Sequence, residues 1–216
     1  MADDDLRTTA RHDGAGGCGF EVLDRTTCYR GYFRLDRLRV RFRLFAGGWS
    51  RPIEREVFER GHAACVLPYD AGRDRVVLVE QFRAPAIEAP GGAWLIETIA
   101  GIVEAGESPA EVVRREAIEE AGLEISALWR IGEILLSPGG SSERLALYCA
   151  RADSAGAGGI HGLEDEGEDI RVLAMGLDEA LAAVAEGRIR VANAVIPLQW
   201  LALNRRRVRE AWRGTG

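Results

Sequence analysis

The stretch that decides the fold is GIVEAGESPAEVVRREAIEEAGL, residues 101–123. Ser108 can cap a helix that begins at the next residue, a proline, and Glu111 completes the Ser-x-x-Glu capping box. Gly122 supplies a stop, because glycine tolerates the left-handed conformation in which many helices end. The sequence therefore predicts a helix over residues 109–121.

One face of this predicted helix is acidic. At about 100° per residue, Glu116, Glu119 and Glu120 gather on one arc. A neighbouring stripe of small and apolar residues consists of Ala110, Val113, Ala117 and Ala121. Like charges at this spacing repel by a few tenths of a kcal/mol per pair in isolated helices. The arc is either a solvated acidic surface or a site for a hard cation such as Mg²⁺, which prefers carboxylate oxygens.

A longer pattern favours the metal site. The Nudix box has the form G-x5-E-x7-R-E-U-x-E-E-x-G-U, where U is aliphatic. Its fixed positions fall on Gly101, Glu107, Arg115, Glu116, Ala117, Glu119, Glu120, Gly122 and Leu123. Every position agrees, although Ala117 is a small choice for U, and a chance match in a chain of this length is on the order of 10⁻⁷. The chain therefore resembles the Nudix hydrolases.

Within that family the chain resembles the bacterial ADP-ribose pyrophosphatases from about Tyr29 onward. Pro138 follows Gly122 by sixteen residues, a position that resembles the mark of the ADP-ribose enzymes. Further similar segments are YRGYFRLD, EVFERGHAA, VEQFR, GLEDEGEDIRV and VIPLQWL. Several of them are shared with pyrophosphatases that act on nucleotide sugars.

The resemblance implies an α/β fold, the Nudix α/β/α sandwich around a mixed sheet. It also implies a small N-terminal antiparallel sheet that is exchanged in a homodimer. Residues 1–59 would form a tail and a β-rich region for dimerisation and substrate framing, and residues 60–216 the Nudix hydrolase domain. Residues 21–59 alone read as a sheet too small to be stable by itself.

The implied reaction is hydrolysis of the pyrophosphate bond of ADP-ribose to AMP and ribose 5-phosphate, with Mg²⁺ or alternatively Mn²⁺. The metal ligands implied by the resemblance are the carbonyl of Ala100 and the carboxylates of Glu116, Glu120 and Glu168. Glu166 would be the general base that activates water, with Glu119 close to the metals.

The resemblance also assigns substrate contacts. Arg83 would contact a phosphate or the terminal ribose, and Arg55 would frame the adenine together with the partner subunit's Tyr32. The other implied substrate-binding residues are Phe33, Glu56, Arg60, Ile102, Ser137, Pro138, Gly139 and Glu143. Tyr32 stands where the family is expected to carry Phe, and either ring can stack on a base.

Alternation of apolar residues predicts the remaining elements. Strands are expected at 29–33, 38–44, 94–100, 145–150 and 170–175, with a buried hairpin from 63–67 and 76–80. Helices are expected at 177–186 and 193–212, with Pro197 near the start of the second, and a long mobile loop at 151–169.

Composition excludes several classes of protein. All 28 basic residues are Arg, so a Lys nucleophile, a Lys Schiff base and a P-loop are excluded. The net charge of -6 argues against a nucleic-acid partner. The four Cys have no C-x-x-C spacing, which disfavours a zinc ribbon. No apolar run has the length of a membrane span and the N-terminus has no secretory signal, so a cytoplasmic protein without a membrane partner is expected.

Two other functions stay open at this stage. The chain could be a Nudix pyrophosphatase for another nucleotide sugar or dinucleotide, because the box does not set the specificity. It could also be a non-catalytic Nudix-fold sensor of a ligand. A sensor need not keep the metal carboxylates, so the complete set here disfavours that reading.

Overall fold

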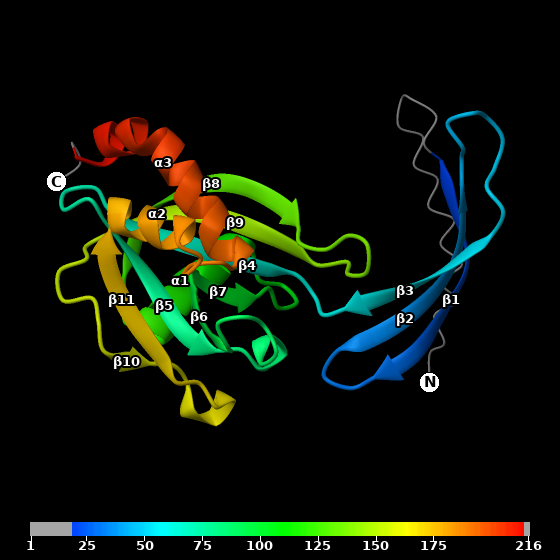
Figure 1. The fold of residues 1–216 in the computed structure, drawn as a ribbon, viewed down its shortest axis with the longest axis horizontal. Helices are drawn as coiled ribbons and strands as arrows, with labels where there is room; N and C mark the ends of the chain where they lie inside the picture. Colours follow the sequence, from blue (N-terminus) through cyan, green and yellow to red (C-terminus); the bar gives the residue numbers. More distant parts are fainter. Residues whose placement is uncertain (1–18, 214–216) are drawn as a thin grey trace. The chain divides into compact units, whose positions relative to one another are not determined.

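The computed structural model describes residues 19–213, apart from the side chains of Glu166 and Arg213 (Figure 1). Its strands are β1 (Phe20–Arg30), β2 (Arg34–Phe42), β3 (Ile53–Glu59), β4 (Ala63–Asp70), β5 (Arg75–Phe82), β6 (Trp94–Glu97), β7 (Ile99–Ile102), β8 (Ile125–Leu135), β9 (Arg144–Ala152), β10 (Ile160–His161) and β11 (Ile170–Gly176). Its helices are α1 (Pro109–Ala121), α2 (Leu177–Ala185), α3 (Ala192–Arg213) and the short 3-10 helices η1 (Ala84–Ala86) and η2 (Glu164–Glu166).

The chain divides into two compact units. The smaller unit contains residues 19–61 together with the loop 137–143, and the larger unit contains 62–136 and 144–213. The sequence predicts a boundary after residue 59. In the structure the smaller unit ends at Gly61 and also contains the loop 137–143. The predicted tail before residue 19 lies outside the described residues.

The smaller unit is an antiparallel sheet in the order β1-β2-β3. Asp36 is buried in it, with 1% exposed, and accepts hydrogen bonds from Arg25 at 3.1 Å and Thr27 at 2.9 Å. Among the described residues of this unit, no apolar side chain is buried. The small N-terminal antiparallel sheet is confirmed, and it has almost no hydrophobic core of its own.

The strand predicted at 29–33 is wrong. β1 ends at Arg30, which pairs with Arg34, and the residues between them form the turn, where the Gly31 amide donates to the Phe33 carbonyl at 2.8 Å. The aromatic residues that suggested a strand lie in or beside this turn, and Tyr32 is 87% exposed there.

The larger unit is a mixed sheet with helices on both faces. Its strand order is β10-β11-β5-β4-β9-β8, and β4 pairs with β9 in parallel while the other pairs are antiparallel. Figure 1 shows α1 on one side of this sheet and α2 and α3 on the other. The α/β fold with a sheet between helices is confirmed.

The core lies on both faces of this central sheet. Every residue of β4 is buried, and successive side chains point to opposite faces of the sheet, as in any strand. Val66 packs with Val113 and Ala117 of α1, whereas Leu67 packs with Leu198 of α3. A strand covered on both faces carries a continuous apolar run, and this is why the sequence predicts a buried strand here.

The predicted hairpin of β4 and β5 is present, but its strands diverge. They pair at Tyr69–Val76 and Asp70–Arg75, beside the turn. Beyond that point β6 pairs with β5 and β7 pairs with β4. The single strand predicted at 94–100 is therefore wrong, because the chain changes pairing partner at Thr98, which is fully buried where the sheet divides.

Helix α1 has the predicted bounds and caps. The Glu111 amide donates to Ser108 Oγ at 3.3 Å, the Ser108 amide donates to Glu111 Oε2 at 2.8 Å, and Gly122 ends the helix with φ 57° and ψ 29°. The buried stripe differs at one position, because Val112 rather than Ala110 is buried with Val113, Ala117 and Ala121.

Two other regions differ from the prediction. β8 has no predicted counterpart, since most of its residues are exposed or half-buried and show no clean alternation. The loop predicted at 151–169 contains the short strand β10 and the turn η2, because Ile160 and His161 pair with β11. Helices α2 and α3 are confirmed to within one residue at each end.

Candidate active site

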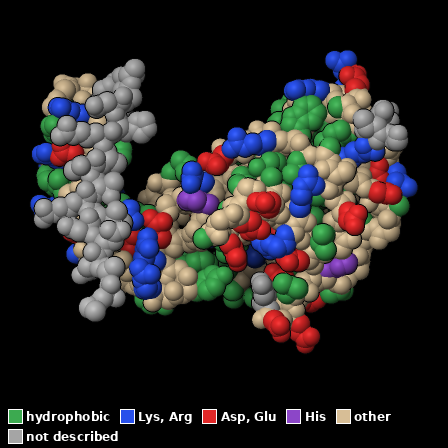
Figure 2. All heavy atoms as spheres, turned by 180° about the vertical axis from the view of Figure 1, so that it is seen from behind, with side chains coloured by type: hydrophobic (Ala, Val, Ile, Leu, Met, Phe, Trp, Pro, Cys, Tyr) green, Lys and Arg blue, Asp and Glu red, His purple; other side chains and the backbone are tan. Residues whose placement is uncertain are grey.

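Arg115 organises the acidic face of α1. Its Nε donates to Glu107 Oε1 at 3.1 Å, and its Nη1 donates to Glu116 Oε1 and to Glu119 Oε2, both at 2.8 Å. The guanidinium therefore offsets the repulsion between neighbouring carboxylates and ties the helix to the preceding loop. Figure 2 shows acidic side chains gathered beside basic ones on one face of the larger unit.

Gly101 brings the backbone of β7 against this cluster. A Cβ atom at this position would lie 1.8 Å from Glu116 Oε1 and 2.4 Å from Glu116 Cδ, far closer than any non-bonded contact. The Glu116 carboxylate thus lies directly on the glycine. The first position of the Nudix box is explained by this packing rather than by a turn, since no left-handed φ is required there.

Glu120 is the most buried acid of the group. Only 2% of it is exposed, and its Oε2 accepts a hydrogen bond from the Ala100 amide at 3.1 Å. Burial raises the pKa of Glu120 to about 8 and that of Glu116 to about 7, and the mutual repulsion of the acids adds to the rise. A cation beside them would lower both pKa values and stabilise the charged forms.

The loop after β10 carries a fourth acid towards the cluster. Glu168 raises the pKa of both Glu116 and Glu120 through its charge. Its Oε2 accepts from the Leu163 amide at 3.1 Å, and the Gly162 amide donates to the last turn of α1 at the Glu119 carbonyl, at 3.3 Å. Glu166 lies in η2 of the same loop, and its side chain is outside the described part.

These donors fit a hard divalent cation. Carboxylate oxygens and a backbone carbonyl are the ligands that Mg²⁺ and related ions prefer. The raised pKa values mark acids for which burial outweighs the positive charges of Arg115 and Arg83. Within the described part of the chain, no three acidic, His or Cys side chains already converge as a metal-binding group. Arg115 holds the Glu116 carboxylate and the Ala100 amide holds that of Glu120, so a bound cation would compete with both for these oxygens.

A second basic group, Arg83, acts on the cluster through its charge, which lowers the pKa of Glu120. Its Nε and Nη2 donate to the two carboxylate oxygens of Glu97, at 3.2 and 3.0 Å. Burial would lower the pKa of Arg83, but its hydrogen bonds to Glu97 and the negative charges of Glu97, Glu120 and Glu168 raise it. Arg83 is therefore a fixed cation beside the acids.

The remaining predicted residue of the larger unit, Ile102, is half-buried and pairs with Ala63 at the end of β7. It lies next in the chain to the glycine that supports Glu116. Together with Ala100, it places the backbone of β7 at the acid cluster.

In the smaller unit, several predicted residues meet at one end of the sheet. Phe33 packs edge-on against Tyr32, with ring centroids 4.7 Å apart, and the Arg60 guanidinium lies 5.6 Å from the centroid of the Phe33 ring. Arg60 also donates to the buried Glu143 at 2.9 Å. The loop of Ser137, Pro138 and Gly139 joins this end through its next residue, Gly140, whose carbonyl accepts from the Phe58 amide at 2.8 Å.

Two predicted residues lie apart from that group. Arg55 and Glu56 are exposed in the middle of β3, opposite Leu38 and Arg37, and Arg55 donates to the Glu54 carbonyl at 2.7 Å. Glu59 lies four positions after Arg55 along the strand, a length of about 13 Å. The structure does not bring Arg55 into contact with Tyr32 of the same chain.

Sequence reasoning missed two residues that join the site. Glu97 holds Arg83, and Asn193 donates through Nδ2 to Glu97 Oε2 at 3.2 Å. Glu97 had one visible signal, because it is a single acid within the apolar run WLIETIA. Asn193 had none, since an Asn near a helix start reads as a cap.

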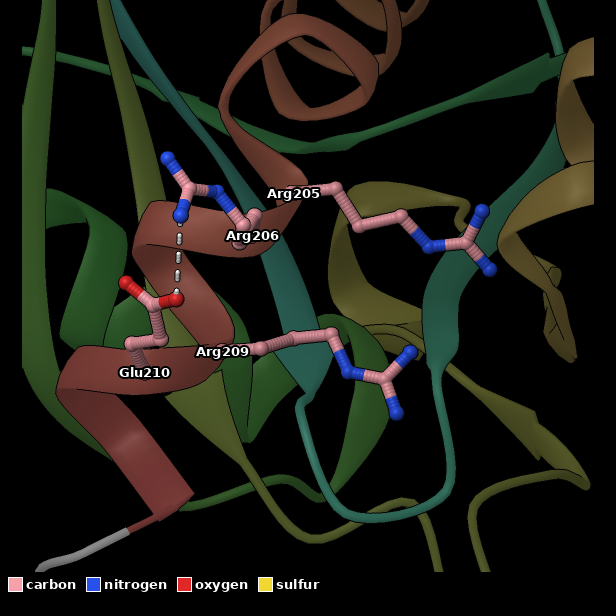
Figure 3. Close-up of a pocket in the computed structure, with 4 residues that line it drawn as sticks. All are labelled: Arg205, Arg206, Arg209 and Glu210. Atoms are coloured by element: carbon pink, nitrogen blue, oxygen red, sulfur yellow. Dashed lines mark ion pairs between the residues drawn. The ribbon is translucent and has the colours of Figure 1, made fainter.

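A separate cavity lies on α3, which covers the other face of the sheet. It has a volume of about 360 Å³ and is lined by Arg205, Arg206, Arg209 and Glu210 (Figure 3). Arg205 and Arg209 pair with Asp74, and Arg206 pairs with Glu210 at 3.6 Å. Since these charges are already paired within the chain, the cavity is a poor candidate for a phosphate site.

Among the described helices, none combines the length and the apolar character needed to cross a bilayer.

Comparison with known proteins agrees with this geometry. The NUDIX domain family matches residues 59–195. ADP-ribose pyrophosphatase of Escherichia coli (strain K12) is 48% identical over 192 residues, covering 89% of this chain and 92% of that protein. ADP-ribose pyrophosphatase of Haemophilus influenzae is 43% identical over 196 residues, covering 89% and 90%.

More distant matches are informative as well. GDP-mannose pyrophosphatase of Citrobacter koseri is 39% identical over 150 residues, covering 68% of this chain and 77% of that protein. A solved structure described as an ADP compounds hydrolase aligns with a TM-score of 0.63 at 20% identity, over 85% of this chain and 94% of that one. This structural match supports the fold. With the box, the acid cluster and these relatives in agreement, the chain belongs to the NUDIX family.

Proposed function

We propose that this chain hydrolyses the pyrophosphate bond of ADP-ribose to AMP and ribose 5-phosphate, with Mg²⁺ as cofactor. The observation that carries the reaction class is the set of acids at Gly101, where Glu116 and the buried Glu120 lie against the backbone of β7. The choice of substrate is supported by the two ADP-ribose pyrophosphatases that match nearly the whole chain.

Residues of the larger unit would share the work of the reaction. Glu116, Glu120, Glu168 and the Ala100 carbonyl would hold the cation, which on binding neutralises phosphate charge and lowers the pKa of water. Arg83 would bind the diphosphate. Glu166 would take a proton from the attacking water while the water oxygen forms a bond to the adenosyl phosphorus. The bridging P–O bond then breaks, and ribose 5-phosphate leaves.

The smaller unit would frame the nucleoside. Arg55 and the partner subunit's Tyr32 would sandwich the adenine, and the remaining contacts would come from Phe33, Glu56, Arg60, Ile102, Ser137, Pro138, Gly139 and Glu143. The separation of Arg55 from Tyr32 within one chain supports a contribution from two chains. The lack of buried apolar side chains among the described residues of this unit supports a homodimer.

We also place the protein in the cytoplasm. Cys65 and Cys149 are buried free thiols, and burial raises the pKa of Cys65 to about 12, so both are protonated and inert at neutral pH. Free thiols of this kind are common where glutathione keeps cysteine reduced.

A substrate panel tests the function. Purified protein with Mg²⁺ is offered ADP-ribose, NADH, ADP-glucose and GDP-mannose, and the products are separated by chromatography. We expect the highest kcat/KM for ADP-ribose. The second candidate, GDP-mannose hydrolysis, is favoured by the relative that is 39% identical. If ADP-ribose is among the poorest substrates of the panel, this second candidate replaces the first.

The general base is tested by substitution. We expect Glu166→Gln to lower kcat by about 10²-fold or more, because a neutral amide cannot accept the proton of water. Calorimetric binding of Mn²⁺ should persist. Glu164→Gln, in the same turn, is the matched control and should keep wild-type kcat. Near-normal turnover of the first variant would move the role to Glu119 or Glu168.

A further inference from the structure

Arg83 is held by more than one layer of residues. Glu97 is 3% exposed, and it accepts from the Arg83 guanidinium through both carboxylate oxygens. Paired donors in this geometry fix the plane of the guanidinium as well as its position. Three of the five N–H bonds of Arg83 have no partner within the described part of the chain, so they remain available to a ligand at the acid cluster.

Glu97 is held in turn by the first turns of α3. Asn193 Nδ2 donates to Glu97 Oε2 at 3.2 Å, and the hydroxyl of the adjacent Thr98 donates to the Asn193 carbonyl at 2.8 Å. Cys65 Sγ, whose thiol stays protonated, lies 3.7 Å from the same carbonyl. The side chain of Asn193 is thus hydrogen-bonded to Glu97 and its backbone carbonyl to Thr98, at the point where the larger sheet divides.

Pro197 explains why the Asn193 carbonyl is available. In a helix this carbonyl would accept from the amide four residues later, and a proline there has no N–H. Pro197 lies inside α3, four residues after Asn193. The proline therefore leaves an acceptor free inside the helix, and Thr98 satisfies it.

We propose that Glu97 is a positioning residue that orients Arg83 for diphosphate binding, and that Asn193 fixes Glu97 in turn. This inference rests on the proposed function for the role of Arg83. The start of α3, on the far face of the sheet, would then contribute to substrate binding, because Asn193 fixes Glu97 and Glu97 orients Arg83.

Two readings of Glu97 predict opposite results for Glu97→Gln. If Arg83 acts only as a positive charge, removing the neighbouring negative charge strengthens the binding of a diphosphate. If orientation matters, the amide keeps one acceptor where the carboxylate had two, and binding weakens. We expect the Kd of ADP, measured by calorimetry, to rise by about tenfold and kcat/KM to fall by about 10- to 100-fold.

A double-mutant cycle separates positioning from a merely structural role. In an Arg83→Ala background we expect Glu97→Gln to change the Kd of ADP by less than about twofold, because the group that it orients is gone. Asn193→Ala should weaken ADP binding by about threefold to tenfold in the wild type and add little to Glu97→Gln. Glu133→Gln, on β8, is the matched control and should bind ADP as the wild type does.

Specific results would overturn the proposal. The proposal is wrong if Glu97→Gln binds ADP as tightly as the wild type or more tightly. It is also wrong if Glu97→Gln changes the Kd of ADP as much in the Arg83→Ala background as in the wild type. Thermal unfolding checks that each variant is folded, and if Glu97→Gln is not, wild-type ADP affinity of Asn193→Ala overturns the proposal alone. Failure of the wild type to hydrolyse ADP-ribose would instead refute the proposed function, and it would leave the ADP-binding cycle interpretable.

Discussion

At the scale of single residues, the tightest constraint on the site is the missing side chain of Gly101. We expect Gly101→Ala to lower kcat by about 10²-fold or more, because its Cβ would displace the Glu116 carboxylate, which lies within 1.8 Å of that position. Steady-state kinetics measures the effect. Gly132→Ala is the control, since a Cβ there meets no atom within 4 Å, and it should be fully active. Wild-type kcat in Gly101→Ala would contradict this account of the box.

Glu120 allows metal binding to be measured separately from catalysis. We expect Glu120→Gln to leave the unfolding midpoint unchanged or higher without metal, because burial already raises the pKa of this acid to about 8. Mg²⁺ at about 100 times its Kd should stabilise the wild type by about 2.7 kcal/mol and the variant hardly at all. Thermal unfolding with and without MgCl₂ measures both. Glu124→Gln, at an exposed position, should respond to Mg²⁺ as the wild type does.

The individual side chains also show what sequence could predict about the site. The three acids of α1 are brought to one place because helical spacing fixes them locally. Glu107 lies in the loop before the helix, and its salt bridge with Arg115 is also short-range, spanning eight positions. Glu97 and Asn193 are 96 positions apart and meet because the start of α3 packs against the end of β6. Such long-range contacts have no periodic signature in a single sequence.

At the scale of elements, α3 is attached to the β4–β5 turn through Asp74. Arg205 and Arg209 both pair with this carboxylate, and Tyr69 donates its hydroxyl to it. Burial alone would raise the pKa of Asp74, but these hydrogen bonds and charges outweigh burial and lower it. Asp74 has φ 58°, a left-handed conformation that Asp and Asn tolerate.

The lowered pKa gives Asp74 a pH-dependent contribution to stability. A depressed carboxyl pKa stabilises the folded state above the unfolded value of about 3.9, and the contribution is lost as pH falls through the folded value. We expect Asp74→Asn to cost about 1–3 kcal/mol at neutral pH, with the difference from wild type shrinking as the pH falls below about 4. Urea unfolding measures it.

Asp178→Asn is the control for that series. Asp178 also pairs with Arg205, at 2.7 Å, but its side chain is 76% exposed. We expect its loss to cost less than about 0.5 kcal/mol at any pH. Equal effects of the two substitutions would show that the β4–β5 turn does not anchor α3.

Among the helices and strands, the sequence predicted correctly those features that depend on residues close together in the chain. The caps of α1 and the apolar run of β4 were read correctly, since each depends on neighbours in sequence. The segment 94–100 was read as one strand because it is mostly apolar and contains no turn residue, whereas the division at Thr98 is set by two different partner strands. β8 was missed because its exposed residues carry no alternation.

At the scale of the whole molecule, the exposed apolar surface of the smaller unit leads us to expect a dimer. No apolar side chain among its described residues is buried, while Tyr29, Tyr32 and Phe45 are 65%, 87% and 102% exposed. A three-stranded sheet needs an apolar face covered to be stable. We expect a homodimer by light scattering, and a substitution such as Phe45→Ser that weakens it. A monomer with full activity would contradict both the dimer and the two-chain adenine site.

The division of the larger sheet has a consequence for hydrogen exchange. The backbone at residues 99–102 pairs with β4, β6 pairs with β5, and Thr98 between the two pairings is fully buried. Detaching this segment would separate the central strands from their neighbours, so we expect its amide hydrogens to exchange with deuterium only through global unfolding. Under the proposed function, the Ala100 carbonyl would then reach the cation from the slowest-exchanging backbone in the protein, whereas Glu166 and Glu168 would come from residues 162–169, which belong to no strand.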